Sequence, residues 1–420
     1  MSADALKADS CPDTLGSLDL EAALALATTL AAEHPPPVPM ERPVDACGGR
    51  ILAEAILAPD AVPAFDMSAV DGYALCRAEL ATRGSVRLRV TRTIRAGETG
   101  RYPPTRVTGT ALRMAANAPV PRPFDAVVSR KDVTEHDGWI GLHERPIAFE
   151  NIRRAGGVAT RGAPLLPAGQ VLGARDTALL AASGHGTVPV RRKLKVAVLS
   201  IGAELLEAGA APAHGLVPDA SRPMILAELS RPWIAPRDLG IVRDDARMLA
   251  QRLDLAATEN RAIIVLGGQP GGNAGPLRDA IRQLGGVTVV PGLAMTPGET
   301  TLIARLGDAM LLGLSGNPVS AHLLMRLVGW PLLHGAAGLP DPEERRSTGT
   351  ATFTWRGQPG QCAVLPIRIA DRTPDGHPFL GTSDGDDADT RGLARADGYA
   401  RIDPGTGKID PGDRLCWVPF

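Results

Sequence analysis

Lysine is the residue type that this sequence comes closest to lacking. The 420 residues contain five lysines, namely Lys7, Lys131, Lys193, Lys195 and Lys408. None lies between Lys195 and Lys408, so chemistry that depends on lysine is excluded from that region. A compositional bias towards arginine is the simplest explanation of the scarcity, and the exclusion holds whatever its cause.

The sequence also lacks an excess of positive charge, clustered cysteines and long apolar runs. Its 45 basic and 46 acidic residues are scattered, so we do not expect nucleic acid as a partner. The five cysteines form no CxxC pair and no zinc-type cluster with histidine, which favours a reducing, cytoplasmic compartment. No segment approaches the roughly 18 apolar residues of a membrane span, and the N-terminus does not resemble a signal peptide. We therefore expect a cytoplasmic protein without a membrane partner.

The chain is too long for one compact core, and its pattern changes along its length. Residues 17–33 are rich in alanine and leucine at helical spacing, with Ser17 as the expected N-cap. Residues 63–150 contain short alternating runs between glycines and prolines, which predict a β-rich module. Residues 174–184 predict a second helical piece, closed by Gly184.

Strand and helix patterns alternate from Lys193 onward, which predicts a mostly parallel sheet covered by helices on both faces. Ligands of such sheets bind at the carboxyl ends of the strands. After about residue 340, short strands separated by Gly, Asp and Pro turns predict a small β-barrel or sandwich. The expected fold class is therefore α/β plus β, in several domains.

The stretch "VPAFDMSAVDGYAL", residues 62–75, carries the first candidate site. Asp66, Ser68 and Asp71 fall within six residues there, and their oxygens could hold a magnesium ion or orient the water shell of an anion. An Asx-turn, in which these side chains only cap the backbone, is the alternative.

The α/β region carries further candidates after its strands. Glu204 follows a buried-type strand, whereas Asp244 and Asp245 stand at a helix start, where an aspartate either caps free N–H groups or binds a ligand. The loop "LGGQPGGNAGP", residues 266–276, is rich in glycine but fits neither GxGxxG nor GxxxxGK[ST]. In "GLSGNPVSA", residues 313–321, a strand leads into a helix whose free N–H groups could bind a phosphate, unless the turn only starts the helix.

The succession of these motifs is far more specific than any one of them. "FDMSAVDGYAL", "APVP" with "DAVV", "NIRRAG", "LSIGAEL", "LGIVRDD", the glycine pair at 267–268 and "GLSGNPVSA" resemble the molybdopterin molybdenumtransferase family. This is the MoeA type, also found as the C-terminal domain of gephyrin, and the resemblance runs from about residue 15 to 420.

The resemblance implies an elongated homodimer with four domains per chain. These would be an N-terminal elongated dimerisation domain (15–62 and 151–190), a β-rich module (63–150), a MogA-like α/β molybdopterin-binding domain (191–340) and a C-terminal β-barrel (341–420). The cleft would lie between the α/β domain of one subunit and the β module of the other. In the family's reaction, adenylylated molybdopterin and molybdate react with Mg²⁺, AMP leaves, and molybdenum ends on the dithiolene of the pterin.

The resemblance also assigns roles to single residues. It implies catalysis and metal binding by Asp66, Asp71 and Glu204. It implies binding of the pterin ligand by Ser68, Asp244, Gly267, Gly268, Gly316, Asn317, Pro318 and Ser320.

Several positions depart from the family pattern, and most of them lose charge or hydrogen bonds. Thr296 and Glu299 stand where a "KPGKP"-like run has two lysines, and Gln361 and Pro366 stand at two arginine positions. The other departures are Ala116, Gly157, Val158, Ala203 and Gly275, the last at an acidic position. A hydrogen bond to a charged oxygen is worth about 1.5–3 kcal/mol, so the two lysines alone would change binding or rate roughly 100- to 10,000-fold.

Two functions therefore stay open at the level of sequence. One is a divergent molybdenumtransferase with impaired or altered activity. The other is a non-catalytic relative that binds or delivers the cofactor, or docks a molybdoenzyme or a cofactor-delivery protein. Arg278 or Arg305 could replace the lost lysines only if they reach the site, although arginine does not match lysine at a fitted position.

Overall fold

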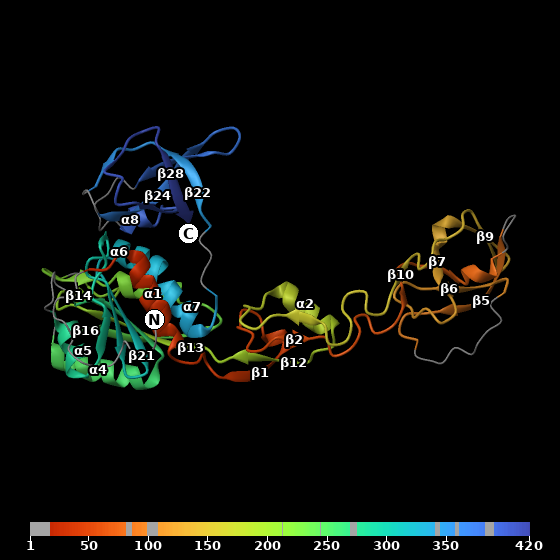
Figure 1. Cartoon of the computed structure of the whole chain (residues 1–420), viewed down its shortest axis with the longest axis horizontal. Helices are drawn as coiled ribbons and strands as arrows, with labels where there is room; N and C mark the ends of the chain where they lie inside the picture. Colours follow the sequence, from red (N-terminus) through yellow and green to blue (C-terminus); the bar gives the residue numbers. More distant parts are fainter. Residues whose placement is uncertain are drawn as a thin grey trace. The chain divides into compact units, whose positions relative to one another are not determined.

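The computed structural model describes residues 17–80, 86–98, 108–211, 213–243, 245–268, 275–340, 345–357, 361–382 and 390–420. The chain divides into two compact units (Figure 1). The first unit comprises Met1–Met40, Gly49–Ile51 and Arg191–Phe420, and the second comprises Glu41–Gly48 and Leu52–Val190. The four-domain division expected from the sequence stays a prediction.

A six-stranded sheet forms the centre of the first unit, in the order β16-β13-β17-β21-β20-β18. The first four strands run parallel, whereas β20 is antiparallel to β21 and β18 is antiparallel to β20. The sheet is therefore mixed rather than purely parallel. The strands are β13 (Leu194–Ile201), β16 (Ile234–Val242), β17 (Ala262–Gly267), β18 (Val287–Val290), β20 (Leu302–Leu306) and β21 (Ala309–Leu314).

Helices cover both faces of this sheet because successive buried residues of its strands point to opposite sides. In β13, Val196 and Val198 join the core under α1, α3, α6 and α7, whereas Ala197 and Leu199 join the core under α4 and α5. The helices are α1 (Leu20–Ala32), α3 (Ser221–Glu228), α4 (Ala246–Glu259), α5 (Pro276–Gln283), α6 (Pro318–Leu324) and α7 (Trp330–Ala337), with a π-helical segment η5 (Met325–Gly329) between the last two. Two short strands, β14 (Leu205–Leu206) and β15 (Val217–Pro218), pair beside the sheet.

The predicted N-cap of the first helix is wrong. Helix α1 begins at Leu20, and the side chain of Asp19 accepts the N–H of Ala22 at 2.7 Å. Ser17 lies too far upstream, because the backbone of Leu18 pairs with another segment and donates to the carbonyl of Gly292 at 3.0 Å.

A second six-stranded sheet follows in the first unit, in the order β19-β24-β25-β22-β28-β26. An additional pairing of β24 with β26 closes it, which confirms the small β-barrel. Its strands are β19 (Met295–Thr296), β22 (Ser347–Ala351), β24 (Cys362–Arg372), β25 (Pro378–Thr382), β26 (Gly398–Ile402) and β28 (Arg414–Pro419). The pair β23 (Trp355–Arg356) and β27 (Lys408–Ile409) and the helix α8 (Thr390–Leu393) complete it.

The second unit contains the β-rich stretch that the sequence predicted within residues 63–150. Its main sheet has the order β7-β4-β6-β5-β9-β8 and is antiparallel except for the pair β5 and β6. The strands are β4 (Gly72–Leu75), β5 (Arg87–Ile94), β6 (Thr110–Met114), β7 (Ala126–Ser129), β8 (Val133–His136) and β9 (Trp139–Leu142). Two-stranded sheets pair β1 (Pro39–Pro43) with β12 (Thr187–Arg191), β2 (Ile56–Leu57) with β11 (Pro164–Leu166), and β3 (Met67–Ser68) with β10 (Ile152–Arg153).

Helical segments complete the second unit. Helix α2 (Ala174–Ala182) ends just before Gly184, which has a φ of 86°, as the sequence predicted. In the described part of this unit, 3-10 turns lie at η2 (Val44–Ala46), η3 (Arg77–Glu79) and η4 (Arg130–Asp132). None of the helices in the described ranges of the chain has both the length and the apolar character that crossing a membrane requires.

Candidate active site

A cavity of about 680 Å³ lies where three parallel strands of the first unit end. Strand β13 pairs with β16 on one side and with β17 on the other, so the chain reverses its direction of progress across the sheet at this point. Such a switch point leaves a crevice at the carboxyl ends of the strands. We call this the strand-end cavity, and its lining includes Ser200, Gly202, Glu204, Asp219, Ser221, Gly267, Gly268, Thr300, Ser315, Gly316 and Pro318.

Two glycines of the cavity, Gly267 and Gly268, are required by its backbone. Gly267 has a φ of 84°, and a Cβ there would lie 2.5 Å from the carbonyl oxygen of Ile201. Gly268 has a φ of 70°, and its Cβ would meet the Ile201 side chain at 2.6 Å. A Cβ on Gly316 would lie 3.5 Å from the Cα of Gly267, so the two loops pass close to each other. This wall of the cavity is therefore backbone.

Glu204 is the predicted catalytic residue that this cavity contains. Its carboxylate lies against the backbone of Gly202, where an added Cβ would be 2.8 Å from either carboxylate oxygen. The side chain is exposed, and Asp219 is the other acidic residue of the lining. No lysine or arginine is among the described residues that line the cavity, so a bound anion would depend on backbone and hydroxyl donors.

The loop after β21 uses part of its hydrogen-bonding capacity internally. The side chain of Asn317 accepts the N–H groups of Val319 at 2.9 Å and Ser320 at 3.3 Å, which makes it the N-cap of α6. The hydroxyl of Ser315 accepts the N–H of Asn317 at 3.2 Å. We expected free N–H groups here, whereas these three are bonded within the loop. Helix capping therefore describes Asn317, and its ligand role stays a prediction.

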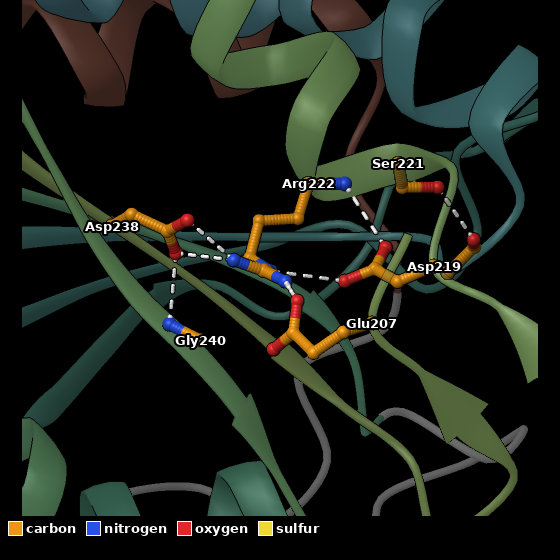
Figure 2. Close-up of polar contacts among 7 residues, drawn as sticks. Glu207, Asp219, Ser221, Arg222, Asp238 and Gly240 are labelled. Carbon is orange, nitrogen blue, oxygen red and sulfur yellow. Dashed lines mark hydrogen bonds and ion pairs between the residues drawn. The ribbon is translucent and has the colours of Figure 1, made fainter. Parts of the chain in front are cut away.

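A buried arginine organises the neighbouring wall (Figure 2). The side chain of Arg222, at the start of α3, is 6% exposed and bonds to three carboxylates, those of Asp219, Asp238 and Glu207. Burial by itself lowers the pKa of Arg222, but the hydrogen bonds to Asp238, Asp219 and Glu207 outweigh it and raise the pKa above the ordinary arginine value. Sequence reasoning missed this cluster, because its only local signal is the spacing of Asp219 and Arg222.

A second cavity of about 520 Å³ lies between α6, the 296–299 turn and the C-terminal barrel. We call it the barrel-edge cavity. It brings together Thr296, Glu299 and Gln361, and the Thr296 hydroxyl lies 3.2 Å from a Glu299 carboxylate oxygen and 3.5 Å from the Gln361 side-chain oxygen. Ser320 lines this cavity and not the strand-end cavity. Arg356 is the only cationic residue in its described lining.

In the second unit, the predicted aspartates bind backbone amides of two other motifs. Asp66 Oδ1 accepts the N–H of Ala155 at 2.7 Å, and Asp71 Oδ1 accepts the N–H of Ala116 at 2.9 Å. Ser68 is fully buried, and its hydroxyl donates to the carbonyl of Val70 at 2.6 Å. The three motifs therefore form one cluster. Asp66 and Asp71 accept from backbone amides that are distant in the sequence, so these bonds are not the local Asx-turns of the alternative. Metal binding by the two aspartates stays a prediction.

The predicted metal ligands do not gather within one unit. Asp66 and Asp71 belong to the second unit and Glu204 to the first. Within the described parts of the chain, no three His, Cys, Asp or Glu side chains are placed to share a metal ion. Asp244 lies outside the described residues, and its neighbour Asp245 caps α4 by accepting the N–H groups of Arg247 and Met248.

Of the remaining departures from the family pattern, Pro366 lies in β24 and lines the barrel-edge cavity, whereas the others lie in loops. Gly275 precedes Pro276 at the start of α5 with a φ of 167°, an extended backbone that an aspartate can adopt. Gly157 lies close to the carbonyl of Arg154, and Val158 is 67% exposed. Ala203 is exposed beside Glu204. The backbone geometry at Gly275 therefore accommodates the acidic residue of the family.

Known proteins match nearly the whole chain. Residues 18–184 match the family model of the MoeA N-terminal region (domain I and II), and residues 197–335 match that of a probable molybdopterin binding domain. A molybdopterin molybdenumtransferase of Haemophilus influenzae is 33% identical over 68% of this chain and 69% of its own, and one of Synechococcus elongatus is 32% identical over 71% and 75%. The crystal structure of a molybdopterin biosynthesis MoeA protein from Pyrococcus horikosii has a TM-score of 0.82 at 26% identity, covering 96% of this chain and 99% of that one. The chain therefore belongs to the molybdopterin molybdenumtransferase family of molybdenum cofactor biosynthesis.

Proposed function

We propose that the strand-end cavity binds a molybdopterin ligand and that molybdenum insertion by this chain is impaired or altered. The observation that carries the proposal is the meeting of Thr296, Glu299 and Gln361 at the barrel-edge cavity. Chemistry on a phosphate ester beside an oxyanion needs positive groups fixed where negative charge develops. At the positions where the resemblance expects two lysines and an arginine, this cavity has a hydroxyl, an amide and a carboxylate. Glu299 would repel molybdate.

The arginines that could have compensated are engaged elsewhere. Arg278 donates to the carbonyl of Pro291, and Arg305 lies 3.5 Å from the carboxylate of Glu33. Neither lines the strand-end cavity or the barrel-edge cavity as far as the structure describes them. Arg356 lines the barrel-edge cavity but is exposed, so water weakens its attraction for an anion.

We infer that Asp66, Asp71 and Glu204 serve the magnesium ion of the family's reaction. Carboxylate oxygens suit Mg²⁺, and the bonds from Ala155 and Ala116 fix the orientation of both aspartates. When bound, the ion would neutralise charge on the phosphate. Equilibrium dialysis should show weaker Mg²⁺ binding by Glu204→Gln and Asp71→Asn than by the unchanged protein. Equal binding by both variants and the unchanged protein would remove Glu204 and Asp71 from the metal site.

The assembly and compartment follow from the same family reasoning. We propose a homodimer, which sedimentation velocity would report as twice the chain mass of 43.8 kDa. We also propose a cytoplasmic location, supported by the free state of Cys47, Cys76, Cys362 and Cys416. Sedimentation as a monomer at micromolar concentration would contradict the first proposal.

The release of AMP tests the proposed function directly. Purified protein is incubated with adenylyl-molybdopterin, Mg²⁺ and molybdate, next to an intact family member. We expect ligand binding, with AMP release slower by roughly 100- to 10,000-fold, the range that two lost charged contacts predict. Release at the rate of the intact member would contradict impaired catalysis.

A restored variant sharpens this test. Gly275→Asp, Thr296→Lys, Glu299→Lys and Gln361→Arg combined should raise molybdate-dependent AMP release by at least about 100-fold. The control Thr258→Lys with Glu144→Lys adds three units of positive charge at exposed positions outside both cavities. The control should leave the rate unchanged. An equal gain in both variants would indicate that only the overall charge matters.

A non-catalytic carrier is the second candidate, since the strand-end cavity is formed although the barrel-edge cavity lacks the two lysines that the resemblance expects at Thr296 and Glu299. A carrier would bind molybdopterin, show no AMP release, and transfer its ligand to a molybdoenzyme or a delivery protein. Rescue of a strain without its molybdenumtransferase would exclude the carrier.

A further inference from the structure

Helix α3 begins at the wall of the strand-end cavity. Asp219, Ala220 and Ser221 line this wall, and Arg222 follows directly. The Ser221 hydroxyl donates to the carbonyl oxygen of Gly316 at 2.7 Å. This bond joins the start of α3 to the loop after β21, so Ser221 sets the spacing between two walls of the cavity.

Arg222 fixes the start of this helix from the other side. Its Nε donates to Asp219 Oδ2 at 3.0 Å, and the backbone N–H of Arg222 donates to Asp219 Oδ1 at 3.1 Å. Asp219 is 3% exposed, and each oxygen of its carboxylate accepts a bond from Arg222. These two bonds close a turn from Asp219 to Arg222, and the turn fixes the position of Ser221 between them.

The two Nη atoms of the Arg222 guanidinium bond to residues of two further segments. Nη1 lies 2.5 Å from both carboxylate oxygens of Asp238 in β16, and Nη2 contacts Glu207 after β14 (Figure 2). Asp238 also accepts the N–H of Gly240 at 2.8 Å. A planar guanidinium can bond to three carboxylates in different directions, which an ammonium group on a flexible stem cannot do in one fixed geometry.

We infer that Arg222 is a positioning residue for the pterin ligand, which acts through Ser221 and the Gly316 carbonyl. The inference rests on the proposed binding of molybdopterin in the strand-end cavity. Arg222 itself does not line the cavity, so its effect on the ligand has to pass through the residues next to it.

A double-mutant cycle tests the route of this effect, with adenylyl-molybdopterin as the probe. Ser221→Ala and Arg222→Gln should each weaken its binding by about 10- to 100-fold, since small misplacements carry penalties of this order. Because Arg222 acts through Ser221, the double variant should bind within about threefold of the weaker single variant. On a logarithmic scale of affinity, Arg222→Lys should recover less than half of what Arg222→Gln loses. Additive losses, or full recovery by lysine, would overturn the inference.

The matched control is Arg237→Gln, which removes an arginine next to Asp238 in β16 that pairs with the exposed side chain of Glu259. It should leave binding unchanged. If Arg222→Gln does not fold, Glu207→Gln with Asp238→Asn removes the two more exposed partners and should give a smaller loss in the same direction. An unchanged affinity in that variant would contradict the inference.

Amide hydrogen exchange keeps the inference separate from the proposed function. Arg222→Gln should speed exchange within residues 315–320 relative to Arg237→Gln, with or without a ligand. Failure of the unchanged protein to bind the probe would overturn the proposed function while this comparison still decides the positioning role. Equal exchange in the two variants would overturn the positioning role alone.

Discussion

At the scale of one residue, the backbone conformation and the surroundings of Gly267 explain why a glycine stands there. Its φ of 84° is left-handed, and the space that a side chain would need is taken by the Ile201 carbonyl oxygen. Gly285, at the end of α5, has a similar φ of 67° but no atom within 4 Å of an added Cβ. The two glycines therefore separate backbone strain from steric overlap.

We expect Gly267→Ala to lower the free energy of unfolding by roughly 2–5 kcal/mol, since left-handed strain costs about 1–2 kcal/mol and overpacking about 1–3 kcal/mol. Gly285→Ala should cost only the first part. Urea denaturation of both variants measures the difference. Equal losses would show that the contact with Ile201 relaxes without cost.

Tyr73 predicts how stability depends on pH in the second unit. It is fully buried in β4, and burial, with a contribution from Glu135, raises the pKa of its hydroxyl to about 12 from 10.0. Between these values the unfolded chain loses the proton and the folded unit keeps it, so stability falls as the pH rises, by up to about 3 kcal/mol. Below about pH 10 the Tyr73 hydroxyl keeps its proton in both the folded and the unfolded state, so it does not make the stability depend on pH.

Urea midpoints measured from pH 9 to pH 12 check this prediction. Tyr73→Phe removes the ionisable group, so its stability should fall less steeply above about pH 10. Parallel curves for the variant and the unchanged protein would contradict the raised pKa.

At the scale of elements, the sequence predicts the helices and strands whose formation depends on their own residues rather than on pairing with distant ones. The buried run of β13 and the periodic helix α4 were both visible in the sequence. Strand β19 was not, since it has two residues and exists through pairing with β24. The run "LIARL" of β20 is short and apolar, and periodicity alone does not distinguish such a strand from a piece of buried helix.

The interruption between α6 and α7 has a local cause that the sequence contains. Pro331 lacks an N–H, and in a continuous α-helix its ring would clash with the carbonyl of Leu327. The π-helical segment Met325–Gly329 precedes it and changes the hydrogen-bond pattern there. Apolar residues recur through α6, the π-helical segment and α7, so periodicity alone predicts one continuous helix there.

The candidate site was predictable only in part, because some of its bonds join segments that are distant in the sequence. Gly267 ends β17, and Gly268, Gly316 and Glu204 come shortly after strand ends. A parallel sheet gathers such ends at one edge. The bonds from Ala155 to Asp66 and from Arg222 to Asp238 join distant segments, and no local pattern specifies them. Motifs thus located the residues, whereas tertiary pairing decides which of their atoms are already bonded.

Asp245 offers a test at this scale, because it caps α4 with bonds to two backbone N–H groups. Asp245→Ala should lower the free energy of unfolding by about 1 kcal/mol, and Asp245→Asn should retain most of the stability because asparagine caps equally well. Asp254→Ala removes an exposed carboxylate from the same helix and is the control. Urea denaturation decides, and equal losses for Asp245→Ala and Asp254→Ala would rule out capping.

At the scale of the whole molecule, the two units have separate hydrophobic cores. Ile264 in β17 belongs to the core under α1 and α7, whereas Ile140 in β9 belongs to the core of the β-rich sheet with Tyr73. Each core is made of residues from its own unit. Proteins of this kind depart from a single cooperative unfolding transition.

We therefore expect calorimetry to resolve two unfolding transitions. Ile264→Ala and Ile140→Ala remove buried side chains that are 1% and 0% exposed, and each should cost about 2–5 kcal/mol within its own unit. Each variant should lower one midpoint by roughly 5 °C or more and leave the other within 1 °C, because a cavity weakens only the core that contains it. Val287→Ala, at a position 45% exposed, is the control and should leave both midpoints unchanged. A single transition that both core variants lower equally would show that the two units unfold as one.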